Sequence, residues 1–184
     1  MDIVFALDSS RSMQSNHFET QKDFIKLVAK HLHLAPRKSR VGTIVFSDEA
    51  RSEISLSQFR NYDHFNNLVN KLTFRGGRTR IDKAVEQAAL MFAGANSRHV
   101  KVPRFFVLLT DGAQTVSPDM VNLNVAVAPL RSAGVKVIAV GIGSSVSYSE
   151  LVTLAHTNQD VFLVQSFDQL MTAVELVKEK ICDY

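Results

Sequence analysis

The chain is short of the residue types that mark several protein classes. Its 184 residues include one cysteine, four prolines and eight glycines. A disulfide scaffold and a collagen-like repeat are therefore excluded. Hydrophobic residues make up 46% and charged residues 21%, which also excludes a disordered chain.

Long apolar runs and a strong charge of one sign are missing as well. Residues 105–109 form one of the longest apolar runs, which is far too short to span a bilayer, so no membrane insertion is expected. The net charge of +3 is too small by itself to indicate nucleic-acid binding. No basic segment followed by an apolar one opens the sequence, and neither end resembles a linker. We expect residues 1–184 to be a single domain excised from a longer multidomain protein.

Strand-like and helix-like patterns alternate along the chain. Short apolar, β-branched and aromatic runs predict strands at residues 3–7, 41–46, 104–109, 135–142 and 161–164, with an edge strand at 51–56 joined to 41–46 by a hairpin. Helical spacing of apolar residues predicts helices over residues 18–32, 81–92 and 167–181, with weaker ones at 62–71 and 120–132. Helix starts are expected at Asn16 with Glu19, Ser117 with Pro118, Ser147 with Glu150, and Ser166 with Gln169. The pattern predicts an α/β fold with a doubly wound, mostly parallel sheet covered by helices on both faces.

Polar side chains follow two of these strands. The first strand is followed by Asp8-Ser9-Ser10-Arg11-Ser12, and the strand at 104–109 by Thr110-Asp111-Gly112. A third segment, Arg75-Gly76-Gly77-Arg78-Thr79, precedes a helix. Ligands of open α/β sheets bind beyond the carboxyl ends of the strands, so we expect the three segments to meet. Carboxylate and hydroxyl oxygens suit Mg²⁺, Mn²⁺ or Ca²⁺, whereas the scattered histidines predict no zinc site.

These motifs resemble the von Willebrand factor A domain over essentially the whole chain. The motif Asp8-x-Ser10-x-Ser12, a threonine after a Gly-Gly loop and Thr110-Asp111-Gly112 occur in the order of that family. The resemblance implies a mostly parallel sheet with one antiparallel edge strand. It also implies a metal-ion-dependent adhesion site made of Asp8, Ser10, Ser12, Thr79 and Asp111.

Each motif also has a simpler interpretation. Thr79 can cap its helix with Asp82 three residues on, the serines can be loop residues, and Asp111-Gly112 can be a turn. All three coincidences at one edge of one sheet are less plausible than a metal site.

Arginines surround the predicted site. Arg11 stands where the family often has glycine, and Arg75, Arg78 and Arg80 flank Thr79. Such charges favour an anionic partner and oppose a bare cation, although they can also be ordinary solvated side chains. We expect these four residues to form a ligand-binding rim.

The resemblance implies an adhesion module of a secreted extracellular matrix protein, of the matrilin and type VI collagen kind and from an invertebrate matrix. Such a module binds a carboxylate of another matrix protein through the ion. A magnesium-dependent phosphoryl-transfer enzyme is the alternative, but Ser10 stands where a phosphatase needs a second carboxylate, and no base is expected near the motifs. A structural matrix module with an unused site and the intracellular branch of the family stay open.

Cys182 is the only cysteine. In extracellular A domains a cysteine after the last helix often pairs with one just before the first strand, and the resemblance implies such a pair in the parent protein. The alternative is a lone, inert thiol. The pairing hypothesis implies that Cys182 is a free, accessible thiol in this chain.

Overall fold

The computed structural model describes residues 1–35, 37–58, 60–94, 102–155 and 157–182. Strands and helices alternate along it, as predicted. The strands are β1 (Asp2–Asp8), β2 (Arg40–Phe46), β3 (Ala50–Ile54), β4 (Arg104–Thr110), β5 (Val135–Ile142) and β6 (Val161–Val164). The α-helices are α1 (Ser15–Lys30), α2 (Tyr62–Asn70), α3 (Ile81–Ala93), α4 (Leu123–Ser132), α5 (Tyr148–Ala155) and α6 (Ala173–Cys182), and short 3₁₀ helices cover η1 (Asn158–Asp160) and η2 (Phe167–Thr172).

The strands form one sheet in the order β3-β2-β1-β4-β5-β6. Only β3 runs antiparallel to its neighbour among the described strands, and it follows β2 through a hairpin. The strand order reverses between β1 and β4, so the carboxyl ends of these two strands flank the switch point of the sheet. The predicted doubly wound, mostly parallel fold with one antiparallel edge strand is confirmed.

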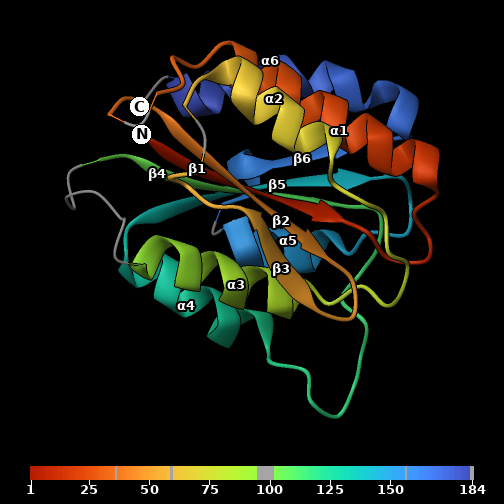
Figure 1. The fold of residues 1–184 in the computed structure, drawn as a ribbon. Coiled ribbons are helices and arrows are strands. Elements are labelled where there is room, and N and C mark those ends of the chain that lie inside the picture. Colours follow the sequence, from red (N-terminus) through yellow and green to blue (C-terminus); the bar gives the residue numbers. More distant parts are fainter. Residues whose placement is uncertain (36, 59, 95–101, 156, 183–184) are drawn as a thin grey trace.

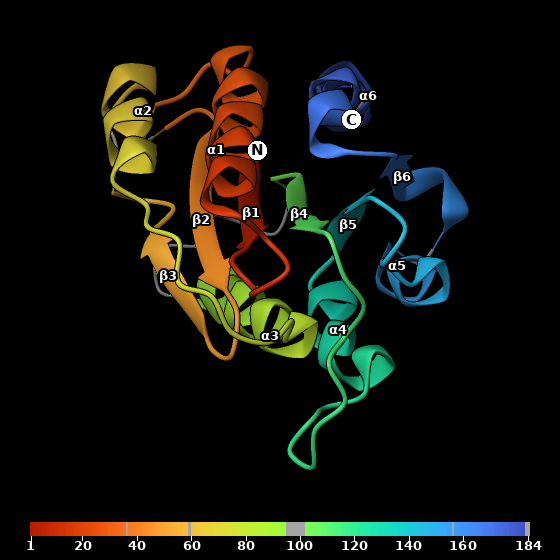
Figure 2. The ribbon, with the colours of Figure 1, turned by 90° about the vertical axis from the view of Figure 1, so that its right-hand side faces the viewer.

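Helices cover both faces of the sheet, with α1, α2 and α6 on one face and α3, α4 and α5 on the other (Figures 1 and 2). Strand β1 shows why its sequence is apolar at successive positions. Ile3, Phe5 and Leu7 pack into the first core, whereas Val4 and Ala6 pack into the second. A strand that is buried on both faces cannot alternate polar and apolar residues.

Several predicted helix starts are wrong. Helix α1 begins at Ser15 after Gln14 instead of at Asn16. The element expected after Ser166 does begin at Phe167, but as the 3₁₀ helix η2, and Ser166 makes no capping hydrogen bond. Helix α4 begins at Leu123, because the Asn122 side chain accepts from the backbone N–H of Asn124 and caps it there. The start at Ser147 is confirmed, since its hydroxyl accepts from the backbone N–H of Glu150 at 3.4 Å.

The two ends of the fold lie on the same side of the molecule, at the amino ends of the parallel strands. Strand β1 begins at Asp2, at the end of the sheet opposite to the loops that follow β1 and β4. Helix α6 returns to that same end before it stops at Cys182 (Figure 1). In the described part of the chain, no helix is long and apolar enough to cross a membrane.

Candidate metal centre

Asp8 is the last residue of β1, and its carboxylate is fully buried. One oxygen accepts the backbone N–H of Ser10 at 2.8 Å, and the other accepts the hydroxyl of Thr110, the last residue of β4, at 2.7 Å. The Asp8 side chain therefore joins the carboxyl ends of the two strands that flank the switch point.

The serines continue from Asp8 toward the next carboxylate. The hydroxyl oxygens of Ser10 and Ser12 lie 3.1 Å apart, and the Ser12 hydroxyl donates to Asp111 Oδ1 at 2.8 Å. The alternate spacing of these residues places both hydroxyls on one side of the turn. Four of the five predicted ligands thus form one connected cluster.

The Gly-Gly loop brings Thr79 to this cluster. The backbone N–H of Arg11 donates to the Gly77 carbonyl at 2.7 Å, and the Arg75 N–H donates to the Ser9 hydroxyl at 2.7 Å. A Cβ atom placed on Gly112 would lie 3.4 Å from Thr79 Oγ1, so the segment after β4 touches the threonine. The structure brings all three predicted segments together.

Thr79 does not act as the cap of its helix. The residue before α3 is Arg80, whose side chain makes no capping hydrogen bond, and the N–H of Asp82 in the first turn donates to Gln114 instead. Thr79 is only 8% exposed. The simpler interpretation of this residue therefore fails.

Burial disfavours the ionised forms of the two carboxylates of the cluster, Asp8 and Asp111. Burial raises the pKa of Asp8 to about 6, against the opposing hydrogen bonds from Thr110 and Ser10, and the charge of Asp111 raises it further. Burial also raises the pKa of Asp111, whereas the hydrogen bond from Ser12 and the charge of His17 act in the opposite direction. A divalent cation among these oxygens supplies the positive charge that favours the ionised forms, so the residues fit such an ion.

One of the four arginines does not belong to the expected rim. Arg80 is 1% exposed and its guanidinium binds the carboxylates of Asp82 and Asp119 at 2.8–2.9 Å, so its inclusion in the rim is wrong. The carboxylate two residues after Arg80 is the sequence signal that would have indicated a buried pair.

The other three arginines lie on the surface. Arg75 binds Glu53 at 2.6 Å, and Arg78 binds Asp48 at 2.6 Å, which partly neutralises both. Arg11 is exposed, and no ion pair joins it to the described residues. Among the four predicted rim residues, Arg11 is therefore the one whose charge no ion pair with a described residue neutralises.

Gln21 supports the site and was missed in the sequence. It is fully buried in α1, where its side chain accepts the N–H of Asp8 at 3.0 Å and donates to the Asp8 carbonyl at 2.8 Å. A glutamine three residues after Phe18 and four before Ile25, on the apolar stripe of a helix, was the signal.

A cavity of about 270 Å³ adjoins the cluster. Ser12, His17 and Asp111 line it together with the loops that follow β5 and β6. The His17 ring stacks on Phe167 with ring centroids 4.0 Å apart. The sequence predicts no candidate base near the motifs, and this is wrong, because His17 on the first turn of α1 lines the same cavity as Ser12 and Asp111.

Known proteins with similar sequences and structures share this architecture. The family model of the von Willebrand factor type A domain matches residues 2–176. The mouse collagen alpha-4(VI) chain is 30% identical over 181 residues, which are 98% of this chain and 7% of the relative. Human matrilin-4 is 29% identical over 187 residues, which are 99% of this chain and 29% of the relative. This chain thus spans less than a third of either relative, and both are proteins of the extracellular matrix.

A solved structure from the mussel byssus, that of proximal thread matrix protein 1, superposes with a TM-score of 0.89 at 27% identity, covering 98% of this chain and 46% of that one. A second structure of the same protein has zinc in its metal-ion-dependent adhesion motif, with a TM-score of 0.88, 27% identity, and coverage of 98% and 45%. From the family match, the shared fold and the matching motifs, we conclude that this chain belongs to the von Willebrand factor type A domain family.

Proposed function

We propose that this domain is a metal-dependent protein-binding module of an extracellular matrix protein. The observation that carries the proposal is the hydrogen-bonded cluster at the switch point, in which Ser12 Oγ lies 2.8 Å from Asp111 Oδ1 and Ser10 Oγ lies 3.1 Å from Ser12 Oγ. Asp8, Ser10, Ser12, Thr79 and Asp111 would hold the ion. When bound, the ion supplies a Lewis-acidic position that can accept a carboxylate of the partner.

The oxygen-rich ligand set favours Mg²⁺, Mn²⁺ or Ca²⁺. Zinc nevertheless belongs among the candidates, because it occupies the corresponding motif of the mussel protein. The argument from hard oxygen ligands alone therefore does not exclude zinc at such a site, since zinc also binds carboxylate oxygens.

We propose an acidic segment of another matrix protein as the partner. Its carboxylate would complete the coordination of the ion, and Arg11 would add a charged contact at the exposed side of the cluster. The cavity beside Ser12 and Asp111 offers room for neighbouring residues of the partner. The mild net charge of +3 gives no reason to propose nucleic acid.

Binding is favoured over catalysis. His17 is the one basic ring beside the cavity among the described residues, but its Nδ1 is buried without a hydrogen-bond partner there. A general base needs an orienting group and access to its substrate. A phosphatase and ATPase screen with Mg²⁺ tests the enzymatic alternative, and turnover that disappears in Asp111→Asn would establish it.

The relatives also support a proposal on the location and the domain organisation. Collagens and matrilins are matrix proteins, so we propose that this domain is secreted into the matrix. We also propose that residues 1–184 form one module of a larger protein, because the relatives are much longer than the matched region.

The experiment has two stages. Calorimetric titration with Mg²⁺, Mn²⁺, Ca²⁺ and Zn²⁺ first tests the ion, with Asp111→Asn as the control. Binding of the domain to immobilised matrix-protein extract is then measured with and without EDTA. It is also measured at low and high salt, because contacts of Arg11 weaken when salt screens exposed charges. Ion binding without ion-dependent capture would favour a structural module with an unused site, and capture unaffected by EDTA would contradict the proposal.

A further inference from the structure

The segment that follows β4 forms hydrogen bonds with both backbone polar groups of Thr79. The N–H of Thr79 donates to the Thr115 hydroxyl at 3.1 Å, and the N–H of Thr115 donates to the Thr79 carbonyl at 2.8 Å. Both backbone polar groups of the candidate ligand are therefore bound by one residue. Thr115 lies four positions after Asp111, which places two candidate ligands on segments that are clamped together.

Gln114 provides a second contact next to the first. Its side-chain oxygen accepts the N–H of Asp82 at 3.0 Å, and its side-chain nitrogen donates to Asp82 Oδ1 at 2.7 Å. Asp82 lies in the first turn of α3, directly after the Thr79 loop. The Gln114 side chain is 7% exposed, so water competes little for these hydrogen bonds.

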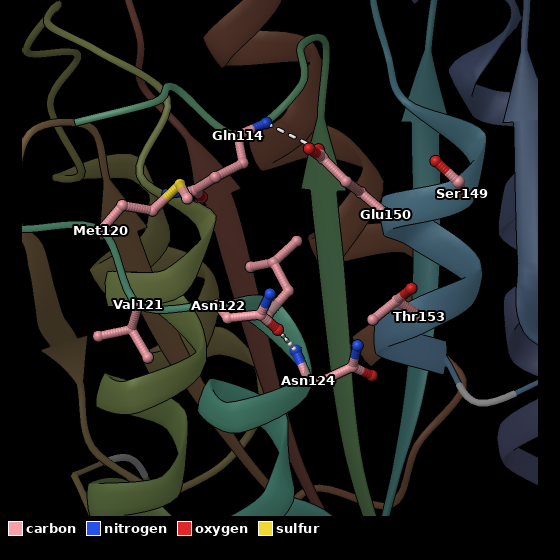
Figure 3. Close-up of a pocket in the computed structure, with 9 residues that line it drawn as sticks. Gln114, Met120, Val121, Asn122, Asn124, Ser149, Glu150 and Thr153 are labelled. Carbon is pink, nitrogen blue, oxygen red and sulfur yellow. Dashed lines mark hydrogen bonds between the residues drawn. The ribbon is translucent and has the colours of Figure 1, made fainter. Parts of the chain in front are cut away.

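The same residue is anchored on its other side. Figure 3 shows the backbone N–H of Gln114 pointing at the carboxylate of Glu150, which comes from α5, and this hydrogen bond measures 2.8 Å. The Arg80 guanidinium braces Asp82 and Asp119, the latter farther along the segment after β4. The Thr79 loop, the segment after β4 and α5 are thus one hydrogen-bonded unit.

We propose that Thr115 and Gln114 are positioning residues of the metal site, which set the distance between Thr79 and Asp111. The inference rests on the proposed metal site and adds residues to which neither the family motif nor the sequence pattern points. Without the Thr115 hydroxyl, the Thr79 N–H loses its acceptor and the loop can relax away from Asp111. Mg²⁺ requires nearly ideal octahedral geometry at about 2.0–2.1 Å, whereas Ca²⁺ accepts variable geometry at about 2.3–2.6 Å. A displaced loop should therefore reduce Mg²⁺ binding more than Ca²⁺ binding.

The test measures the affinity for each metal ion alone by calorimetry, at a temperature where every variant is folded. Thr115→Val keeps the shape of the side chain and removes the hydroxyl, and we expect about tenfold weaker Mg²⁺ binding from this loss of one partly buried hydrogen bond. Thr115→Ser restores the hydroxyl and should bind Mg²⁺ within about twofold of the wild type. Val116→Ala, at the exposed neighbouring position, is the matched control and should match the wild type.

Gln114→Met provides a second variant if Thr115→Val does not fold, because it keeps the side-chain length and removes both hydrogen bonds to Asp82. Mg²⁺ affinity equal to that of the wild type in Thr115→Val, or in Gln114→Met, would overturn the inference. Equal losses for Mg²⁺ and Ca²⁺ would also overturn it, since a merely structural role predicts no change in ion preference. A wild-type protein that binds no ion refutes the proposed function itself, whereas a wild type that binds and a Thr115→Val variant that binds equally well refutes only the positioning role.

Discussion

Replacing Asp111 by asparagine should separate metal binding from the stability of the fold. The amide oxygen of asparagine can still accept the hydrogen bond from the Ser12 hydroxyl, which now reaches Asp111 Oδ1 at 2.8 Å. What disappears is the negative charge. Because burial raises the pKa of Asp111, the charged form is disfavoured in the metal-free fold. We therefore expect Asp111→Asn to be at least as stable as the wild type in EDTA.

With metal the order should reverse. An ion that binds only the folded state at 100 times its dissociation constant stabilises that state by about 2.7 kcal/mol. For a domain of this size, each kcal/mol raises the Tm by roughly 2–4 °C, so the wild type should melt about 5–10 °C higher with saturating ion than in EDTA. In Asp111→Asn one remaining carboxylate cannot balance the ion, and the shift should vanish.

Thermal unfolding followed by circular dichroism measures both effects on the same samples. Asp111→Ala serves as a companion variant, because it removes the charge together with the hydrogen-bond acceptor. An ion-dependent rise in Tm that is as large in Asp111→Asn as in the wild type would refute the assignment of this carboxylate to the ion. A large loss of stability in EDTA would instead show that the charge of Asp111 supports the fold.

Three further predictions concern the surroundings of the site. Burial favours a higher pKa for Asp82, but the hydrogen bond from its guanidinium partner prevails and lowers that pKa to about 2. The ionised carboxylate thus stabilises the fold above the unfolded pKa of about 4, and this contribution should fall between about pH 4 and pH 2 in urea titrations of the wild type but not of Asp82→Asn. Gly77→Ala should destabilise the fold by about 1–3 kcal/mol in urea unfolding, more than Gly76→Ala does, because only the Gly77 Cβ would meet a carboxylate oxygen, at 2.4 Å. Equal effects of the two alanines would contradict the steric reason. Cys182 is exposed, so a thiol reagent should modify the native protein rapidly at one site, and slow labelling of the folded chain would contradict this placement.

The strands could be predicted because their pattern reflects burial that every part of the strand shares. In β1, apolar residues occupy successive positions since both faces of the strand meet a core. Helix starts were less predictable. Ser117 and Pro118 have the sequence of a helix start, yet α4 begins at Leu123 because the Asn122 side chain caps it. Capping motifs are local, and their use depends on the path that the chain takes between packed elements.

The candidate site, too, could be predicted only in part from the sequence. Asp8 and Asp111 were predictable as neighbours because the carboxyl ends of parallel strands meet at the switch point. Arg80 was placed wrongly because charge alone does not show whether a side chain faces solvent or a carboxylate such as Asp82. The positions of Gln114 and Thr115 were not predictable, since their contacts with the Thr79 loop span more than thirty residues and depend on the conformation of that loop.

The placement of both ends of the fold opposite to the candidate metal centre has a consequence for avidity. β1 begins and α6 ends at the amino ends of the parallel strands, far from the loops around Ser12 and Asp111. A flanking domain joined at either end would therefore leave those loops uncovered. Under the proposed function, several copies of such a domain in one polypeptide can engage one extended matrix surface at the same time. Each bound domain raises the local concentration of the next, so modest individual affinities can combine into an attachment that is roughly a hundredfold to ten-thousandfold tighter.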